Sequence, residues 1–245
     1  MKKMLIVGGS NGIGLSIATE MANKSDCKKI YIIDRIKPSN ELMNEKFEFH
    51  QFDLSNTDYS IFKQFNDIDS LMITAGFGRL ALFKDLDEQY IIDSININTT
   101  AAIRIIHYFY NRISHKDDFY CGIMVSIAGF MSSPFFSVYG ASKAALKVFI
   151  ESVNVELEKA QTKNRILNIS PGFIKGTNFY NGKTDLVLTK TLANDIIKHL
   201  QAKDDLFIPQ YNEVYKDVLE RYHKDFRAEG IHSYEYKEKS GRINI

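Results

Sequence analysis

The sequence predicts an α/β protein in which helices cover both faces of one doubly wound parallel sheet. Short apolar runs alternate with segments of helical periodicity along most of the 245 residues, an order typical of successive β-α-β units. A glycine-rich turn separates the first apolar run from the first helical segment. Polar residues and glycines follow most of the runs, at the strand ends where the ligands of such sheets bind.

The first β-α-β unit has the pattern of a dinucleotide-binding site. Residues 4–7 form the expected strand and residues 15–22 the expected helix. The candidate phosphate-binding residues in the turn between them are Gly8, Ser10, Asn11, Gly12, Ile13 and Gly14. Such a turn lets backbone N–H groups approach a pyrophosphate, whose charge a helix N-terminus favours. The next strand, residues 29–33, leads into Asp34, a carboxylate placed to accept hydrogen bonds from the adenosine ribose.

The third strand, residues 47–52, is followed by two candidates for contact with adenine, Asp53 and Leu54. Asp53 is equally suited to place a negative charge at the start of a short helix expected over residues 57–65.

The fourth strand, residues 68–74, leads into Ala75 and Gly76, where glycine lets the backbone lie close to a ligand. A long helical region, bent near its middle, is expected over residues 87–112.

The fifth strand, residues 119–125, ends at a serine that precedes a possible proton-transfer pair. Ser126 follows this strand, and a long helix over residues 137–160 carries Tyr139 and Lys143. Residues four positions apart share a helix face, and an ammonium near a phenol lowers the pKa of the tyrosine from about 10 toward neutrality. The Ser126 hydroxyl is placed to hold a substrate oxygen beside that phenol.

The sixth strand, residues 165–169, precedes Pro171 and Gly172, and residues 189–200 and 206–209 form the last helix and strand of the expected sheet. We therefore expect a single domain over residues 1–245, with its core at 3–209. An amphipathic helix is expected over residues 211–226, followed by a polar, loosely held tail at 229–245.

The composition of the chain argues against several classes of function and location. A net charge of +1 gives no field for nucleic acid, and no apolar run is long enough for a signal peptide or a spanning helix. Two distant cysteines suit a reducing compartment, and the six histidines lack metal-ligand spacing. A cytoplasmic protein that acts on a small molecule, without a metal, is expected.

These motifs together resemble the short-chain dehydrogenase/reductases over roughly residues 3–209. Ser126 fits the catalytic serine of that family, and Tyr139 and Lys143 fit its Tyr-x-x-x-Lys pair. Tyr139 follows Ser126 by thirteen positions, as in the family pattern. Asn98 fits the family asparagine better than Asn96 does. Thr74 replaces an asparagine common in the family, which we expect to weaken one backbone-supporting contact. The resemblance also implies cofactor contacts after the sixth strand, from Pro171, Gly172, Ile174 and Thr177.

The resemblance implies a Rossmann fold and hydride transfer between a nicotinamide and an alcohol or carbonyl carbon. Tyr139 would act as acid and base, Lys143 would also hold the nicotinamide ribose, and Asn98 would hold a water that relays protons. Asp34 favours NAD, whereas Arg35 would permit NADP. Tyr139 and Lys143 are therefore expected to bind the cofactor as well as to act in catalysis.

The resemblance further implies a homodimer or homotetramer formed through the helices at 87–112 and 137–160. Aromatic and sulfur side chains flank the expected substrate side, as a pocket wall, as ordinary packing or as part of a subunit contact: Phe130, Met131, Phe135, Phe136, Phe173, Phe179 and Tyr180. The alternative functions are a catalytically silent nicotinamide-binding regulator and a nucleotide-sugar-modifying enzyme. Only about seventy residues follow Gly172, which disfavours the latter.

Overall fold

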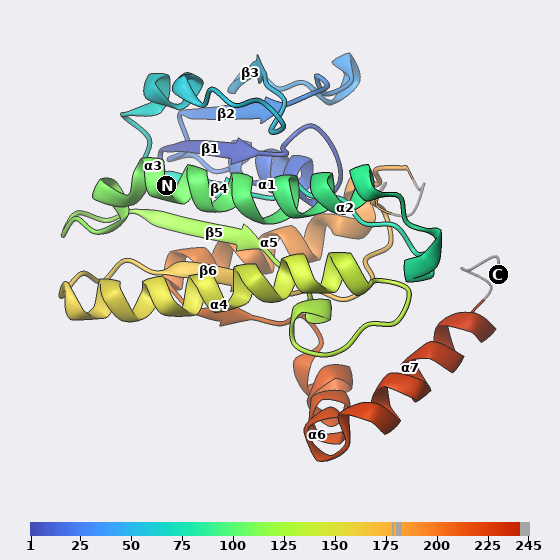
Figure 1. Ribbon diagram of the computed structural model, residues 1–245. Helices are drawn as coiled ribbons and strands as arrows, with labels where there is room; N and C mark the ends of the chain where they lie inside the picture. The colour runs from blue at the N-terminus through green and yellow to red at the C-terminus, as the bar shows by residue number, and fades with distance from the viewer. Residues whose placement is uncertain (178, 180–182, 241–245) are drawn as a thin grey trace.

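The protein folds around one parallel sheet whose strands lie in the order β3-β2-β1-β4-β5-β6-β7 (Figure 1). The computed structural model describes residues 1–177, 179 and 183–240. The strands are β1 Lys3–Val7, β2 Lys29–Asp34, β3 Phe47–Gln51, β4 Ser70–Ile73, β5 Tyr120–Met124, β6 Ile166–Ile169 and β7 Leu206–Phe207. Because the chain returns from β3 to place β4 beside β1, the strand order reverses between β1 and β4, which is where such sheets open a ligand crevice.

Helices cover both faces of the sheet, as the sequence predicts. They are α1 Gly12–Ala22, α2 Glu88–Ile95, α3 Ala101–Ile113, α4 Ser137–Lys159, α5 Leu186–Ala202, α6 Lys216–Lys224 and α7 Phe226–Lys239. Figure 1 shows α3 and α4 in front of the sheet and α1 and α5 behind it. None of the described helices combines the length and apolarity needed to cross a membrane.

The central strand β1 shows why the sheet needs both helical layers. Leu5 and Val7 pack into the core on the α3–α4 side, whereas Met4 and Ile6 pack into the core on the α1–α5 side. All four side chains are at most 1% exposed. Successive strand residues point to opposite faces, so a run of four apolar residues is stable only where both faces are covered.

The bend expected within residues 87–112 is present as a π-helical turn, Asn96–Thr100, between α2 and α3. A π turn adds a residue to the helix and shifts the positions of the side chains around it. Asn98 and Thr99 are thereby buried against the core.

The other sequence-based boundaries agree with the structure for the seven strands to within two residues. Helices α1 and α5 each begin three residues earlier than expected, and two other helical segments differ in type or continuity. Only Ser60–Phe65 of the expected helix at 57–65 is helical, as a 3-10 helix. The expected helix at 211–226 is divided into a π turn, Tyr211–Tyr215, and α6, and it ends where Asp225 adopts an extended conformation.

The expected loose tail is instead mostly helix α7. Asp225 begins this helix by accepting hydrogen bonds from the backbone N–H groups of Arg227 and Ala228. Glu229, which is 8% exposed, forms an ion pair with Arg221 of α6 at 2.8 Å. The segment expected to be a solvated tail therefore contains a buried carboxylate, which pairs with a half-exposed arginine of α6. Residues 241–245 lie outside the described part of the chain.

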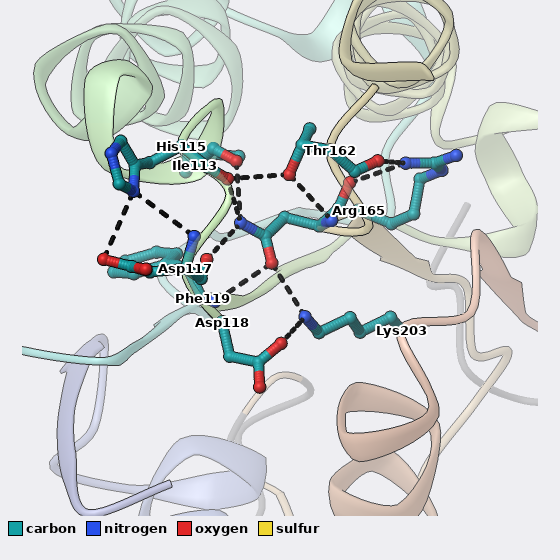
Figure 2. Close-up of polar contacts among 9 residues, drawn as sticks. Ile113, His115, Asp117, Asp118, Phe119, Thr162, Arg165 and Lys203 are labelled. Atoms are coloured by element: carbon teal, nitrogen blue, oxygen red, sulfur yellow. Dashed lines mark hydrogen bonds and ion pairs between the residues drawn. The ribbon is translucent and has the colours of Figure 1, made fainter. Parts of the chain in front are cut away.

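A buried asparagine joins the loops at the amino-terminal edge of β5 and β6. Asn164 Nδ2 donates to the carbonyl oxygens of Ile113, His115 and Asp117 at 2.8–3.0 Å, and its Oδ1 accepts from Phe119 N and from the ammonium of Lys203. Figure 2 shows these contacts, together with the ion pair between Lys203 and Asp118. One amide thus ties the end of α3, the start of β5 and the end of α5 together.

Replacing this amide is expected to destabilise the fold. An Asn164→Leu variant has a side chain of similar size, but the buried backbone groups that Asn164 contacts lose their hydrogen bonds. The free energy of unfolding should therefore fall by about 3 kcal/mol and the Tm by roughly 6–12 °C. Urea denaturation and a thermal melt measure both. The matched variant at the exposed Asn66, Asn66→Leu, should change stability by less than about 0.5 kcal/mol. Similar losses in the two variants would contradict this role of Asn164.

Candidate active site

The glycine-rich turn lies at the carboxyl end of β1, directly against the end of β4. Gly8 has φ +88°, and a Cβ there would lie 2.4 Å from the backbone nitrogen of Ala75. Only glycine fits, because the conformation is left-handed and the neighbouring backbone leaves no space. The turn is therefore fixed at the strand-order reversal between β1 and β4.

Thr74 supports this turn with its side chain. Its hydroxyl lies 2.8 Å from the carbonyl oxygen of Gly8 and 3.1 Å from that of Val7, placed to donate to either. A Cβ at Gly14 would lie 2.5 Å from the same hydroxyl oxygen, so α1 begins in contact with it. The hydroxyl of Thr74 thus supports the backbone here, and the expectation that it does so more weakly than an asparagine stays a prediction. No local sequence pattern predicts this contact, because it joins residues 66 and 67 positions apart.

Asp34 and Ser10 form the second side of the turn. The Asp34 carboxylate accepts hydrogen bonds from the backbone N–H groups of Ser10 at 3.1 Å and of Arg35 at 2.7 Å. The Ser10 hydroxyl is buried and, within the described residues, has no hydrogen-bond partner. A buried hydroxyl without a partner is unfavourable unless a ligand completes it.

A cavity of about 480 Å³ opens at this point. Its lining contains the predicted cofactor residues Gly8, Asn11, Asp34, Arg35, Asp53, Leu54, Ala75 and Gly76. It also contains residues for which the sequence predicted no cofactor contact, Val7, Ile33, Phe52, Thr74, Phe77, Asp93, Ile97 and Phe179. The remaining residues of the turn, Ser10, Gly12, Ile13 and Gly14, belong to the same loop and the first turn of α1.

One unpredicted residue reaches the turn from far along the chain. Thr184, just before α5, accepts a hydrogen bond from the backbone N–H of Gly12 at 2.9 Å. This N–H belongs to the free amino-terminal end of α1, and the bond spans 172 residues of sequence. The sequence shows an ordinary threonine in a polar loop, which gives no sign of the contact.

Asp53 does not begin the 3-10 helix, which starts at Ser60, and its contact with adenine stays a prediction. Its carboxylate lines the cavity and also accepts a hydrogen bond from the Ser55 backbone N–H at 2.8 Å. This backbone hydrogen bond holds the pKa of Asp53 below its usual range. The Leu54 carbonyl oxygen, in turn, accepts a hydrogen bond from the Tyr59 hydroxyl.

The structure brings Ser126 and Tyr139 to the carboxyl end of β5. Ser126 begins a 3-10 helix, Ile127–Gly129; its Oγ accepts from the Ala128 N–H at 3.2 Å and donates to the Pro171 carbonyl oxygen at 3.4 Å. Tyr139 lies in the first turn of α4 and is 8% exposed. Its ring packs between the rings of Phe136 and Phe179, at 5.2 and 5.4 Å between centroids.

Lys143 is more deeply buried than Ser126 and Tyr139, at 3% exposure. Its Nζ donates to the Met124 carbonyl oxygen at 2.9 Å and lies 5.7 Å from the centre of the Tyr139 ring. A Cβ built on Gly76 would be 3.3 Å from this nitrogen, so the ammonium also reaches the edge of the cavity. Burial lowers the pKa of Lys143 to about 8.

Asn98 contacts the loop after β4. Its Oδ1 accepts from the Phe77 N–H and its Nδ2 donates to the Phe77 carbonyl oxygen, both at 2.9 Å. Nδ2 also lies within hydrogen-bond distance of Ser94 Oγ and Ser142 Oγ. The amide thus fixes the loop of Gly76 and Phe77 to α4, and the water relay expected for Asn98 stays a prediction.

The predicted contacts after β6 lie away from the cavity. Pro171 and Gly172 pack beside Ser126, and Thr177 donates to the Ile174 carbonyl oxygen within its own turn. None of the four lines the cavity in the described part of the chain.

Several of the flanking side chains take part in packing within the fold, and their role as a substrate wall or subunit contact stays a prediction. Phe136 and Phe179 pack on Tyr139, whereas Phe130 and Met131 pack with Ile127. Phe135 packs on Tyr234 of α7, at 4.5 Å between ring centroids, and Phe173 is 44% exposed. Tyr180 lies outside the described residues.

Comparisons with known proteins identify the family of this chain. The sequence model of the family described as short chain dehydrogenase matches residues 2–185, so the chain belongs to that family of oxidoreductases. The NADP-dependent 3-hydroxy acid dehydrogenase of Schizosaccharomyces pombe is 31% identical over 195 residues, which cover 71% of this chain and 72% of that protein. Dehydrogenase RED2 of Cochliobolus heterostrophus is 28% identical over 66% of this chain, which spans 63% of that relative's length.

Solved structures show the same fold. A short-chain dehydrogenase from Burkholderia cenocepacia, in complex with NADP, has a TM-score of 0.77 at 16% identity and covers 95% of this chain and 99% of its own. A short-chain dehydrogenase from Sphingobium yanoikuyae, in complex with NADPH, has a TM-score of 0.75 at 21% identity, with coverages of 93% and 96%. The predicted fold class, a doubly wound parallel sheet, is therefore confirmed.

The buried ammonium predicts an unusual dependence of stability on pH. The pKa of Lys143 in the folded protein, about 8, lies below its ordinary value of 10.5, so between these values the unfolded chain binds more protons. Raising the pH from 7 to 10 should therefore stabilise the wild type relative to a Lys143→Met variant, by about 2–3 kcal/mol. Urea denaturation of both proteins across this range measures the difference, and parallel curves would contradict it.

Proposed function

We propose that this protein is an NAD(P)-dependent oxidoreductase that transfers a hydride between the nicotinamide and an alcohol or carbonyl carbon. One observation carries the proposal: the buried Lys143 ammonium lies between the Tyr139 ring and Gly76, which lines the cavity. A proton-transfer pair therefore adjoins the dinucleotide-sized crevice. A protein that only bound the dinucleotide would not need a buried, uncompensated charge there.

The residues present fit a dinucleotide. The turn at Gly8 has no room for a side chain, and the partnerless hydroxyl of Ser10 can hydrogen-bond a phosphate oxygen. Asp34 and Asp53 line the cavity and can accept hydrogen bonds from ribose or adenine. When bound, the nicotinamide supplies or accepts the hydride.

The chain's own groups position the substrate and move the proton. Ser126 Oγ can donate a hydrogen bond to the substrate oxygen once it leaves the Pro171 carbonyl. The Tyr139 hydroxyl gives its proton to the developing alkoxide in reduction and takes one from the alcohol in oxidation. The Lys143 charge stabilises the phenolate form, and such acid–base assistance accelerates a reaction by roughly 10²–10⁴-fold.

The first test removes the transferable proton. Tyr139→Phe keeps the ring between Phe136 and Phe179 and should lower kcat by at least about 100-fold, while the dissociation constant for the dinucleotide changes by less than about 3-fold. The measurements are absorbance of the reduced nicotinamide with a panel of ketones and alcohols, and calorimetric titration of the dinucleotide. Full activity in this variant would refute the acid–base role of Tyr139.

The choice between NAD and NADP depends on neighbouring residues with opposite effects. The Asp34 carboxylate repels a 2′-phosphate and so favours NAD, whereas Arg35 can pair with that phosphate. The NADP and NADPH named for the similar solved structures support NADP. Because Asp34 is held by two backbone N–H groups, its charge stays at the cavity wall whichever dinucleotide binds.

Substitutions at the two positions should therefore shift the preference in opposite directions. Asp34→Asn keeps an oxygen for the Ser10 N–H but loses the charge, and should raise kcat/KM for NADPH relative to NADH by about 10-fold or more. Arg35→Ala should lower the same ratio. Steady-state kinetics with both reduced dinucleotides give the ratios, and unchanged ratios in both variants would exclude these residues as the determinants.

Association through α2, α3 and α4 stays a prediction. Large apolar side chains exposed on these helices support it: Ile92, Ile95, Tyr108, Val148 and Val155.

The 3-hydroxy acid named for the Schizosaccharomyces pombe relative makes 3-hydroxy and 3-oxo compounds the first substrates to try.

A further inference from the structure

Tyr215 reaches the substrate side of the site from outside the part of the chain that matches the family. The family match ends at residue 185, and Tyr215 ends the π turn that precedes α6. A Cβ built on Gly172 would lie 1.6 Å from the Tyr215 hydroxyl oxygen and 2.6 Å from Cζ. The phenol thus occupies the space that a side chain at position 172 would need.

Contacts through two chain segments place this phenol next to Ser126. The carbonyl oxygen of Pro171, the residue before Gly172, accepts hydrogen bonds from Ser126 Oγ at 3.4 Å and from Ile127 N at 3.1 Å. Ile127, the residue after Ser126, belongs to the same apolar cluster as Tyr215. Ser126 and Pro171 are joined by a hydrogen bond, and Tyr215 lies against the next residue after each of them, Ile127 and Gly172.

The Tyr215 hydroxyl is a neutral donor with unused capacity. Across the described residues, it forms no hydrogen bond, although its ring packs against Ile127, Ile208 and Leu219. Burial raises the pKa of Tyr215, and the neighbouring Tyr236 raises it further. The group therefore stays protonated at neutral pH and can donate its O–H to an acceptor.

We propose that Tyr215 is a substrate-binding residue that donates a hydrogen bond to a second oxygen of the substrate, apart from the reacting one. The inference rests on the proposed function and refines its substrate class. The buried cluster against which Tyr215 packs, Ile127, Ile208 and Leu219, is apolar, and the donor is uncharged. The fitting substrate is therefore an oxo or hydroxy compound with an uncharged second acceptor, such as an ester or amide carbonyl.

A matched pair of ketones tests this. Ethyl 3-oxobutanoate and 2-heptanone have the same chain length, but only the former carries an ester. Binding of each is measured by calorimetry to enzyme saturated with oxidised dinucleotide, which cannot reduce a ketone. The wild type should bind the ester more tightly by roughly 3- to 10-fold, the range for one neutral hydrogen bond. Tyr215→Phe should abolish this preference.

The control is Tyr222→Phe, a phenol of α6 that lies outside the described contacts of Ser126 and should leave the preference unchanged. A purely structural role for Tyr215 would change stability but not the ratio of the two affinities.

An unchanged ratio in Tyr215→Phe, or equal or absent binding of both ketones by the wild type, would overturn the inference. Turnover that depends on Tyr139 without any effect of Tyr215 on the ratio would refute this inference alone, whereas failure to bind either dinucleotide would refute the proposed function.

Discussion

The buried ammonium of Lys143 is the constraint to which the rest of the site is fitted. Removing a charge from water is unfavourable, and among the described residues no carboxylate pairs with this one. Its stabilising contacts are the Met124 carbonyl oxygen and the nearby Tyr139 ring. Because α4 begins at Ser137, its first two turns carry Tyr139 and Lys143 past the end of β5.

The loop after β4 lies beside this ammonium and is held by Asn98. Gly76 leaves room for the lysine nitrogen, and Asn98 fixes the next residue, Phe77, through both of its backbone polar groups. Asn98 can do so because the π turn between α2 and α3 places it inside the core. The irregular helix, the amide and the buried ammonium are thus parts of one arrangement, which joins the cavity to Tyr139.

The sequence predicted what local patterns encode and missed what long-range contacts decide. Alternation of buried runs and helices predicted the strands to within two residues, because β1 and its neighbours are buried on both faces. The glycine turn was predicted because strand, turn and helix are contiguous. The hydroxyl of Thr74 and the contact of Thr184 with Gly12 were missed, because each joins segments distant in sequence. Helix α7 was missed because its many charged residues are typical of a solvated tail, and the ion pair between Glu229 and Arg221 is visible only in the structure.

The segment after β7 contacts the loop between Ser126 and Tyr139. Lys237 of α7 donates to the Ser133 hydroxyl and the Pro134 carbonyl oxygen at 2.8 Å, and Tyr234 packs on Phe135, whose φ of +66° is unfavourable for a side chain of that size. These contacts hold the loop between Ser126 and Tyr139, including Phe136, which packs on the Tyr139 ring. Under the proposed function, the family-matched part of the chain would bind the dinucleotide and move the proton. The C-terminal segment would then act through the loop that it holds against Tyr139, so changes in this segment would alter the substrate side of the site.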